Sequence, residues 1–188
     1  GSLPDVTQAS PERDIVFVKP DTFVVGDRVQ STGNGVRRIW TMNFPGTPII
    51  NGDHITYLTS NSGIGIRRLS PTGLTAQPVQ RKSVFPNFHS DVATRVDVAD
   101  ANGDTSLFLH VIKLGSNPST TAFRADAAGY IGARMPTLDG GSALVRFFAN
   151  RAGGYVEIRD KDDKLIDSAG LPETVKLPPL FKSISLAP

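Results

Sequence analysis

Three histidines are the first residues of this sequence that could move a proton, because imidazole is the side chain that titrates near neutral pH. They are His54, His89 and His110. None lies at the short spacing of a helix-borne or finger-type metal site. The sequence contains no cysteine, which excludes disulfides, thiolate metal ligands and cysteine nucleophiles. We therefore predict no metal site and no cofactor.

Two further residues extend the acid–base candidates. His54 follows a turn and precedes Tyr57, so the two form a proton-transfer pair or else His54 is simply exposed. Asp27 shares a strand face with valines, where a carboxylate needs partners. It is either reactive or, as is more usual at a strand end, accepts backbone hydrogen bonds. His110 alternates with apolar residues, which predicts a buried, hydrogen-bonded core residue.

Three basic dipeptides, Arg37-Arg38, Arg67-Arg68 and Arg81-Lys82, carry local positive charge. If the fold brings them together they will attract an acidic polymer; otherwise they form a solvated surface. The net charge of only +2 gives no indication of nucleic-acid binding.

Aromatic side chains near arginines suit sugars that carry carboxylate or sulfate groups. Such aromatics are Trp40, Tyr57, Tyr130 and Tyr155. Trp40 shares a strand face with other large apolar residues and is expected in the core. The predicted substrate-binding residues are Arg37, Arg38, His54, Tyr57, Arg67 and Arg68, and the predicted structural residues are Asp27, Arg28, Trp40 and His110.

The elements that must position these residues are short strands. Two apolar runs, 15–18 and 23–25, are joined by Lys19-Pro20-Asp21-Thr22, which predicts a β-hairpin. The first run has no polar position, so we expect it to be covered on both faces. Similar segments recur along the chain and none has a helical period. The pattern predicts an all-β protein, an antiparallel β-sandwich of about twelve short strands with little or no helix.

The domain organisation follows from the same pattern. Residues 1–14 read as a tag scar and lead-in segment, 15–170 as the sandwich, and 171–188 as a proline-rich tail or final edge strand. The irregular stretch 81–92 is expected to be a loop. No apolar run approaches the ~20 residues that span a bilayer, so no membrane partner is predicted.

Two stretches resemble the C-terminal β-sheet region of the heparinase II/III-like polysaccharide lyases and related alginate lyases. The first is DIVFVKPDTFVVGDRV with RRIWTMNFPGTPIINGDHITY, and the second is TRVDVADANGDTSLFLHVIKLG. The positions that carry the resemblance are Phe17, Pro20, Asp21, Phe23, Val24, Val25, Asp27, Arg28, Val29, Trp40, Pro48, Ile50, Gly52, Arg95, Asp97, Val98, Asp104, Phe108, Leu109, His110 and Val111.

The resemblance implies an antiparallel β-sandwich that follows an α/α toroid. Such enzymes cleave uronic-acid-containing polysaccharides by β-elimination, with a tyrosine and histidines as acid and base. Those groups lie in the toroid and in a histidine-rich segment early in the sandwich, and neither precedes Ile15 here. The resemblance therefore assigns no catalytic residue to this chain.

Our first hypothesis is that the chain is the non-catalytic C-terminal β-sandwich portion of a secreted or periplasmic lyase. Its partners would be an acidic polysaccharide and the upstream toroid of the same protein. A stand-alone carbohydrate-binding or adhesion module is the second hypothesis, and an exposed row of aromatics and arginines on one sheet would favour it. A third is a complete small enzyme, which requires His54, Tyr57 and Asp27 to converge in one pocket.

Overall fold

The computed structural model describes residues 9–31, 36–81, 93–100 and 103–173, which form fourteen strands and no helix. All pairings between neighbouring strands are antiparallel. The predicted all-β antiparallel sandwich is therefore confirmed, with fourteen strands where about twelve were expected. Within the described part there is no helix that could cross a membrane.

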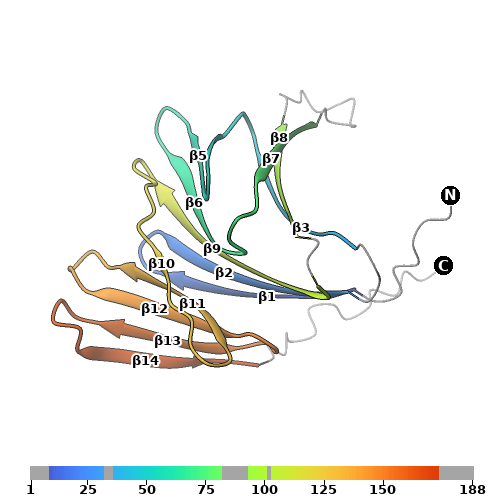
Figure 1. Cartoon of the computed structure of the whole chain (residues 1–188). Coiled ribbons are helices and arrows are strands. Elements are labelled where there is room, and N and C mark those ends of the chain that lie inside the picture. The colour runs from blue at the N-terminus through green and yellow to red at the C-terminus, as the bar shows by residue number, and fades with distance from the viewer. Residues whose placement is uncertain (1–8, 32–35, 82–92, 101–102, 174–188) are drawn as a thin grey trace, which may run out of the picture.

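Three sheets make up the structure (Figure 1). The central sheet has the order β1-β2-β9-β6-β5-β4, with the strands β1 (Ala9–Val18), β2 (Thr22–Ser31), β9 (Thr105–Gly115), β6 (Gly63–Ser70), β5 (His54–Leu58) and β4 (Ile49–Asn51). The second sheet contains β10 (Phe123–Arg124), β11 (Tyr130–Pro136), β12 (Ser142–Phe148), β13 (Gly154–Arg159) and β14 (Leu165–Leu171) in chain order. The third has the order β3-β8-β7, with β3 (Arg38–Phe44), β8 (Ala93–Asp100) and β7 (Ala76–Arg81).

The central sheet is covered on both faces, and each face has its own core. Val24, Leu109 and Val111 pack against the five-stranded sheet, in one cluster with Val145 and Phe147. The opposite face packs against the three-stranded sheet, in a cluster whose buried members are Trp40, Phe44, Ile55, Ile66, Ala76, Val96, Val98 and Phe108. Strand β9 contributes to both cores because alternate side chains point to opposite faces. Its continuous apolar run is that of a central strand, as expected from the sequence.

The β1–β2 hairpin departs from the prediction in two ways. Strand β1 begins at Ala9, so residues 9–14, expected to be part of the lead-in segment, belong to the sheet. The expectation that the run 15–18 is covered on both faces was wrong. Val16 and Val18 are buried against the five-stranded sheet, whereas Ile15 and Phe17 are 58% and 48% exposed. Among the residues whose burial the structure describes, none of β1 belongs to the core under the three-stranded sheet, so Ile15 and Phe17 are exposed on this face.

Asp27 and Arg28 lie on opposite faces of β2 and are both buried. Asp27 accepts hydrogen bonds from Arg13, which lies directly across from it in the β1–β2 register. Arg28 donates to Glu12, to Asp14 and to a backbone carbonyl of the five-stranded sheet. The carboxylate that needed a partner on an apolar face thus obtains it from a side chain of β1 instead of backbone amides.

Trp40 and His110 form a buried stack between the central and three-stranded sheets. Their ring centroids lie 3.9 Å apart with planes 17° from parallel. His110 is fully buried, and neither ring nitrogen has a hydrogen-bond partner in the described structure. Burial, with the positive charges of Arg68 and Arg13, lowers its pKa from 6.5 to about 3. The prediction of a core histidine holds, but the predicted hydrogen bond is not found.

Candidate functional site

The six residues predicted to bind substrate do not form one site. Arg38 is buried and donates hydrogen bonds to the hydroxyls of Ser106 and Ser31. Arg68 is buried as well, and its guanidinium contacts the Asp53 carboxylate. Both arginines are therefore used inside the fold, and neither is placed on a solvated surface or available to bind an acidic polymer, the two alternatives that the sequence had suggested. Successive side chains of a strand point to opposite faces, and in both pairs that the structure describes the second arginine is the buried one.

Tyr57 and Arg37 also lie apart from the others. Tyr57 packs against Phe44 in the core beneath the three-stranded sheet, with ring centroids 5.9 Å apart. Arg37 is exposed just before β3. His54 and Tyr57 are three positions apart in β5, so they point to opposite faces of the central sheet. Asp27 is held by Arg13 on a different strand, and the convergence required for a complete small enzyme is not found.

His54 and Arg67 are the two predicted residues that the structure brings together. They are directly opposed in the register of β5 and β6, and Arg67 Nη1 lies 2.8 Å from His54 Nε2. Because a guanidinium can only donate, Nε2 is the acceptor in this contact. Arg67 forms no ion pair with any described residue, and its Nε is buried without a hydrogen-bond partner. Its positive charge is thus not neutralised locally.

A pocket of about 220 Å³ opens beside this pair, on the face of the central sheet that also meets the five-stranded sheet. The side chains and backbone that line it come from β5, β6 and the segment after β9: His54, Thr56, Leu58, Ile66, Ser116, Asn117, Pro118, Ser119 and Thr120. The lining thus includes the hydroxyls of Thr56, Ser116, Ser119 and Thr120 and the amide of Asn117, and its residue His54 contacts Arg67.

Two glycines of β6 make room for the segment that closes this pocket. A Cβ on Gly65 would lie 1.8 Å from the carbonyl oxygen of Pro118, and one on Gly63 would lie 3.1 Å from the Pro118 ring. The backbone of residues 116–120 can approach the sheet only because these positions have no side chain. The glycines thus determine the position of the polar wall.

We expect Gly65→Ala to displace this wall. The added methyl would meet backbone and not a flexible side chain, so the free energy of unfolding should fall by about 1–3 kcal/mol. Urea unfolding followed by circular dichroism measures the loss. Gly170→Ala is the matched control, because nothing lies within 4 Å of the Cβ it adds, and it should change stability by less than about 0.5 kcal/mol. Equal stability of the two variants would contradict the packing of Pro118 on Gly65.

The chemistry available at the pocket is binding of a negatively charged group. The lining hydroxyls and the Asn117 amide can donate to a carboxylate or sulfate. Arg67 is not part of the lining, but it contacts the lining residue His54 and adds positive charge nearby. No carboxylate lines the pocket that could serve as a partner acid or base to His54. The described residues contain no cluster of histidine and acidic side chains that could hold a metal ion.

The sequence did not identify the wall residues Ser116, Asn117, Ser119 and Thr120, although a signal was present. The run SNPSTT between two strands is rich in hydroxyls and carries a proline, which is typical of an ordered polar loop. His89 and Lys82 lie outside the described residues, as does nearly all of the expected loop 81–92.

Comparison with known proteins gives the site no precedent. Neither a model of a known family nor a curated protein matches this sequence.

Proposed function

We propose that the chain is the non-catalytic C-terminal β-sandwich portion of a heparinase II/III-like polysaccharide lyase. The parent enzyme, secreted or periplasmic, would act by β-elimination on a uronic-acid-containing polysaccharide. In it this chain packs on an upstream α/α toroid and helps to form the substrate cleft. The observation that carries the proposal is the Arg67 guanidinium, which has no ion-pair partner among the described residues and contacts His54, one of the residues that line a hydroxyl-rich pocket.

The placement of the residues that carry the resemblance supports a structural role for most of them. Asp27, Arg28, Trp40 and His110 are all buried and engaged in ion pairs or stacking. Residues with those contacts are occupied in holding the sheets together. The polymer would then be bound by other side chains. Of the predicted binding residues, His54 and Arg67 are the two that contact each other, and Arg67 has no ion-pair partner among the described residues.

The proposal is tested by binding and turnover on alginate, heparin, heparan sulfate, hyaluronan and a neutral glucan. We expect no ultraviolet absorbance from unsaturated product with this chain alone. Calorimetry should detect binding to the acidic polymers that weakens as salt is raised, because Coulomb attraction is screened. New absorbance from the isolated chain would overturn the non-catalytic assignment.

Arg67→Ala should weaken binding of the acidic polymers about tenfold or more, since a hydrogen bond to a charged group contributes roughly 1.5–3 kcal/mol. Arg37→Ala is the matched control, because it removes the same charge from an exposed position. Arg67→Lys should restore only part of the affinity, since lysine lacks the planar fork. Equal losses in Arg67→Ala and Arg37→Ala would show that net charge, and not this pocket, binds the polymer.

A second candidate function, a stand-alone carbohydrate-binding module, is favoured by the outer face of the five-stranded sheet. The Tyr130 ring stacks on Phe148 at 4.8 Å and meets Tyr155 edge-on at 5.2 Å. Arg146 donates to the Tyr155 hydroxyl at 2.5 Å, and Arg151 lies over the Phe148 ring. Aromatic rings with arginines are suited to sugars. If Tyr155→Ala abolishes binding and Arg67→Ala does not, this face is the binding surface.

A further inference from the structure

The two larger sheets are not matched in width. Strand β11 packs over β9, and β12 packs over β1, which is the last strand of the central sheet on that side. The five-stranded sheet continues beyond this point with β13 and β14 (Figure 1). Val156 and Ile158 of β13 are consequently only partly buried, and every residue of β14 except Leu171 is exposed. Among the described residues, no sheet faces the inner side of these two strands beyond β1.

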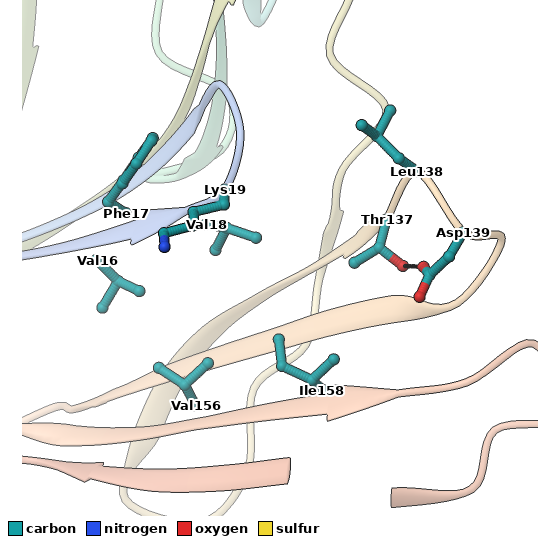
Figure 2. Close-up of a pocket in the computed structure, with 9 residues that line it drawn as sticks. All are labelled: Val16, Phe17, Val18, Lys19, Thr137, Leu138, Asp139, Val156 and Ile158. Atoms are coloured by element: carbon teal, nitrogen blue, oxygen red, sulfur yellow. Dashed lines mark hydrogen bonds between the residues drawn. The ribbon is translucent and has the colours of Figure 1, made fainter. Parts of the chain in front are cut away.

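A cleft of about 360 Å³ lies where this mismatch begins. Figure 2 shows Val156 and Ile158 pointing from β13 toward the β1–β2 hairpin. The remaining lining comes from the end of β1 and from the turn after β11: Val16, Phe17, Val18, Lys19, Thr137, Leu138 and Asp139. The cleft therefore runs beside the free edge of β1 and is lined mainly by apolar side chains.

The free edge of β1 is protected along only half of its length. Its first part carries Pro11 followed by three charged residues, features that prevent strand addition. Residues 15–18 have no charge, no proline and no bulge, and their register with β2 is regular. Such an edge presents unpaired backbone N–H and C=O groups that can bind another strand.

We propose that this edge of β1 binds an antiparallel strand from the polypeptide that precedes the described residues in the longer parent protein. The inference rests on the proposed function, in which this chain is one part of a larger enzyme. The added strand would lie in the central sheet and cover β13 on one face. Its other face would continue the layer of Ile15 and Phe17. It must therefore be apolar on both faces opposite 15–18, and polar opposite the charged residues 12–14.

Chain order favours an upstream segment as the occupant. β1 is the first of the described strands, and consecutive strands are neighbours in a sheet about two-thirds of the time. A segment that turns back before Ala9 would run antiparallel to β1, which is the pairing of every strand in this structure. The edge continues the existing sheet, so one added strand would obtain backbone hydrogen bonds and apolar cover together.

A second copy of this chain fits the edge poorly. If two β1 strands paired edge to edge, the β13 and β14 strands of each copy would extend beneath the hairpin of the other. That layer is already filled by the other copy's own β12, which packs on β1. The edge of β1 can therefore accept only a strand that does not bring a second sheet into the layer occupied by β13 and β14.

Hydrogen–deuterium exchange read by mass spectrometry on this chain and on the longer parent protein tests the proposal. We expect peptides covering 15–18 to exchange about tenfold or more slowly in the parent protein, because the outward backbone amides become hydrogen-bonded. Phe17→Lys in the parent protein should remove much of this protection by placing a charge in the new interface. Phe123→Lys is the matched control, since Phe123 is 61% exposed at a different sheet edge.

Each other outcome has a distinct meaning. Equal exchange in both proteins, with lyase activity present in the parent, would overturn the strand addition and leave the proposed function standing. Protection in a parent protein without lyase activity would support the added strand and count against the proposed function. Protection in this chain alone that rises with concentration would assign the edge to a second copy. Protection that disappears when residues 174–188 are deleted would assign it to the tail.

Discussion

Lowering the pH from 7 to 4.5 should reduce the free energy of unfolding by between about 2 and 3 kcal/mol through His110 alone. The imidazole is fully buried against Trp40, and burial is the main reason that its pKa falls from 6.5 to about 3. Arg68 and Arg13 add to the shift, because each disfavours a second positive charge nearby.

The direction of this pH dependence follows from the number of protons bound to the folded and the unfolded states. Between about pH 6.5 and pH 3 the unfolded chain holds a proton on His110 and the folded protein does not. Acid therefore favours the unfolded state in this window, by up to about 1.4 kcal/mol for each pH unit. The contribution is absent above pH 7 and complete below pH 3.

Urea unfolding at pH 7, 5.5 and 4.5 measures the effect, and the variant His110→Leu isolates it. The variant loses the ring stack at every pH, but its free energy of unfolding should depend less steeply on pH than that of the unsubstituted chain. His54→Gln is the control, because His54 is partly exposed and accepts from Arg67. If His110→Leu and the parent chain have the same pH dependence, His110 is not the group that titrates on unfolding.

Local sequence patterns predicted much of this fold because they report on neighbours in the chain. The hairpin at 15–29, the core position of Trp40 and the central place of the strand around His110 all follow from alternation. The existence of the third sheet could not be predicted from alternation, because an alternating strand can pack its apolar face against a sheet on either side. Ile15 and Phe17 are an example. Their apolar run is compatible with burial on both faces, but whether they are buried depends on how far the facing sheet extends.

The sequence predicted only part of the candidate site, because local patterns do not specify contacts between distant segments. His54 and Arg67 were both selected, yet so were Arg38 and Arg68, which ion pairs and hydroxyls hold inside the fold. The contact between His54 and Arg67 depends on the register of β5 against β6, and the polar wall depends on a loop crossing Gly65. Both are relations between distant segments, which residue types alone do not specify.

Replacing Arg28 with alanine should lower the free energy of unfolding by about 3–5 kcal/mol, because the change removes one partner from a buried ion pair. Its side chain is only 6% exposed and makes three connections. Nε lies 3.0 Å from Glu12, Nη2 lies 2.9 Å from Asp14, and Nη1 lies 3.0 Å from the carbonyl oxygen of Phe148. Arg28 thus joins the β1–β2 hairpin to the five-stranded sheet.

Urea unfolding of two variants separates the charge from the packing. Arg28→Met keeps most of the apolar contact of the side chain but removes the guanidinium hydrogen bonds to Asp14 and to the Phe148 carbonyl, so it should be destabilised nearly as much as Arg28→Ala. Arg134→Ala breaks an exposed ion pair with Asp163 and should cost no more than about 1 kcal/mol. If Arg28→Met were as stable as the parent chain, apolar contact would hold the hairpin on the second sheet. The role of the buried guanidinium would then be to select Glu12 and Asp14 as its partners in β1, and this selection would determine the register of the hairpin.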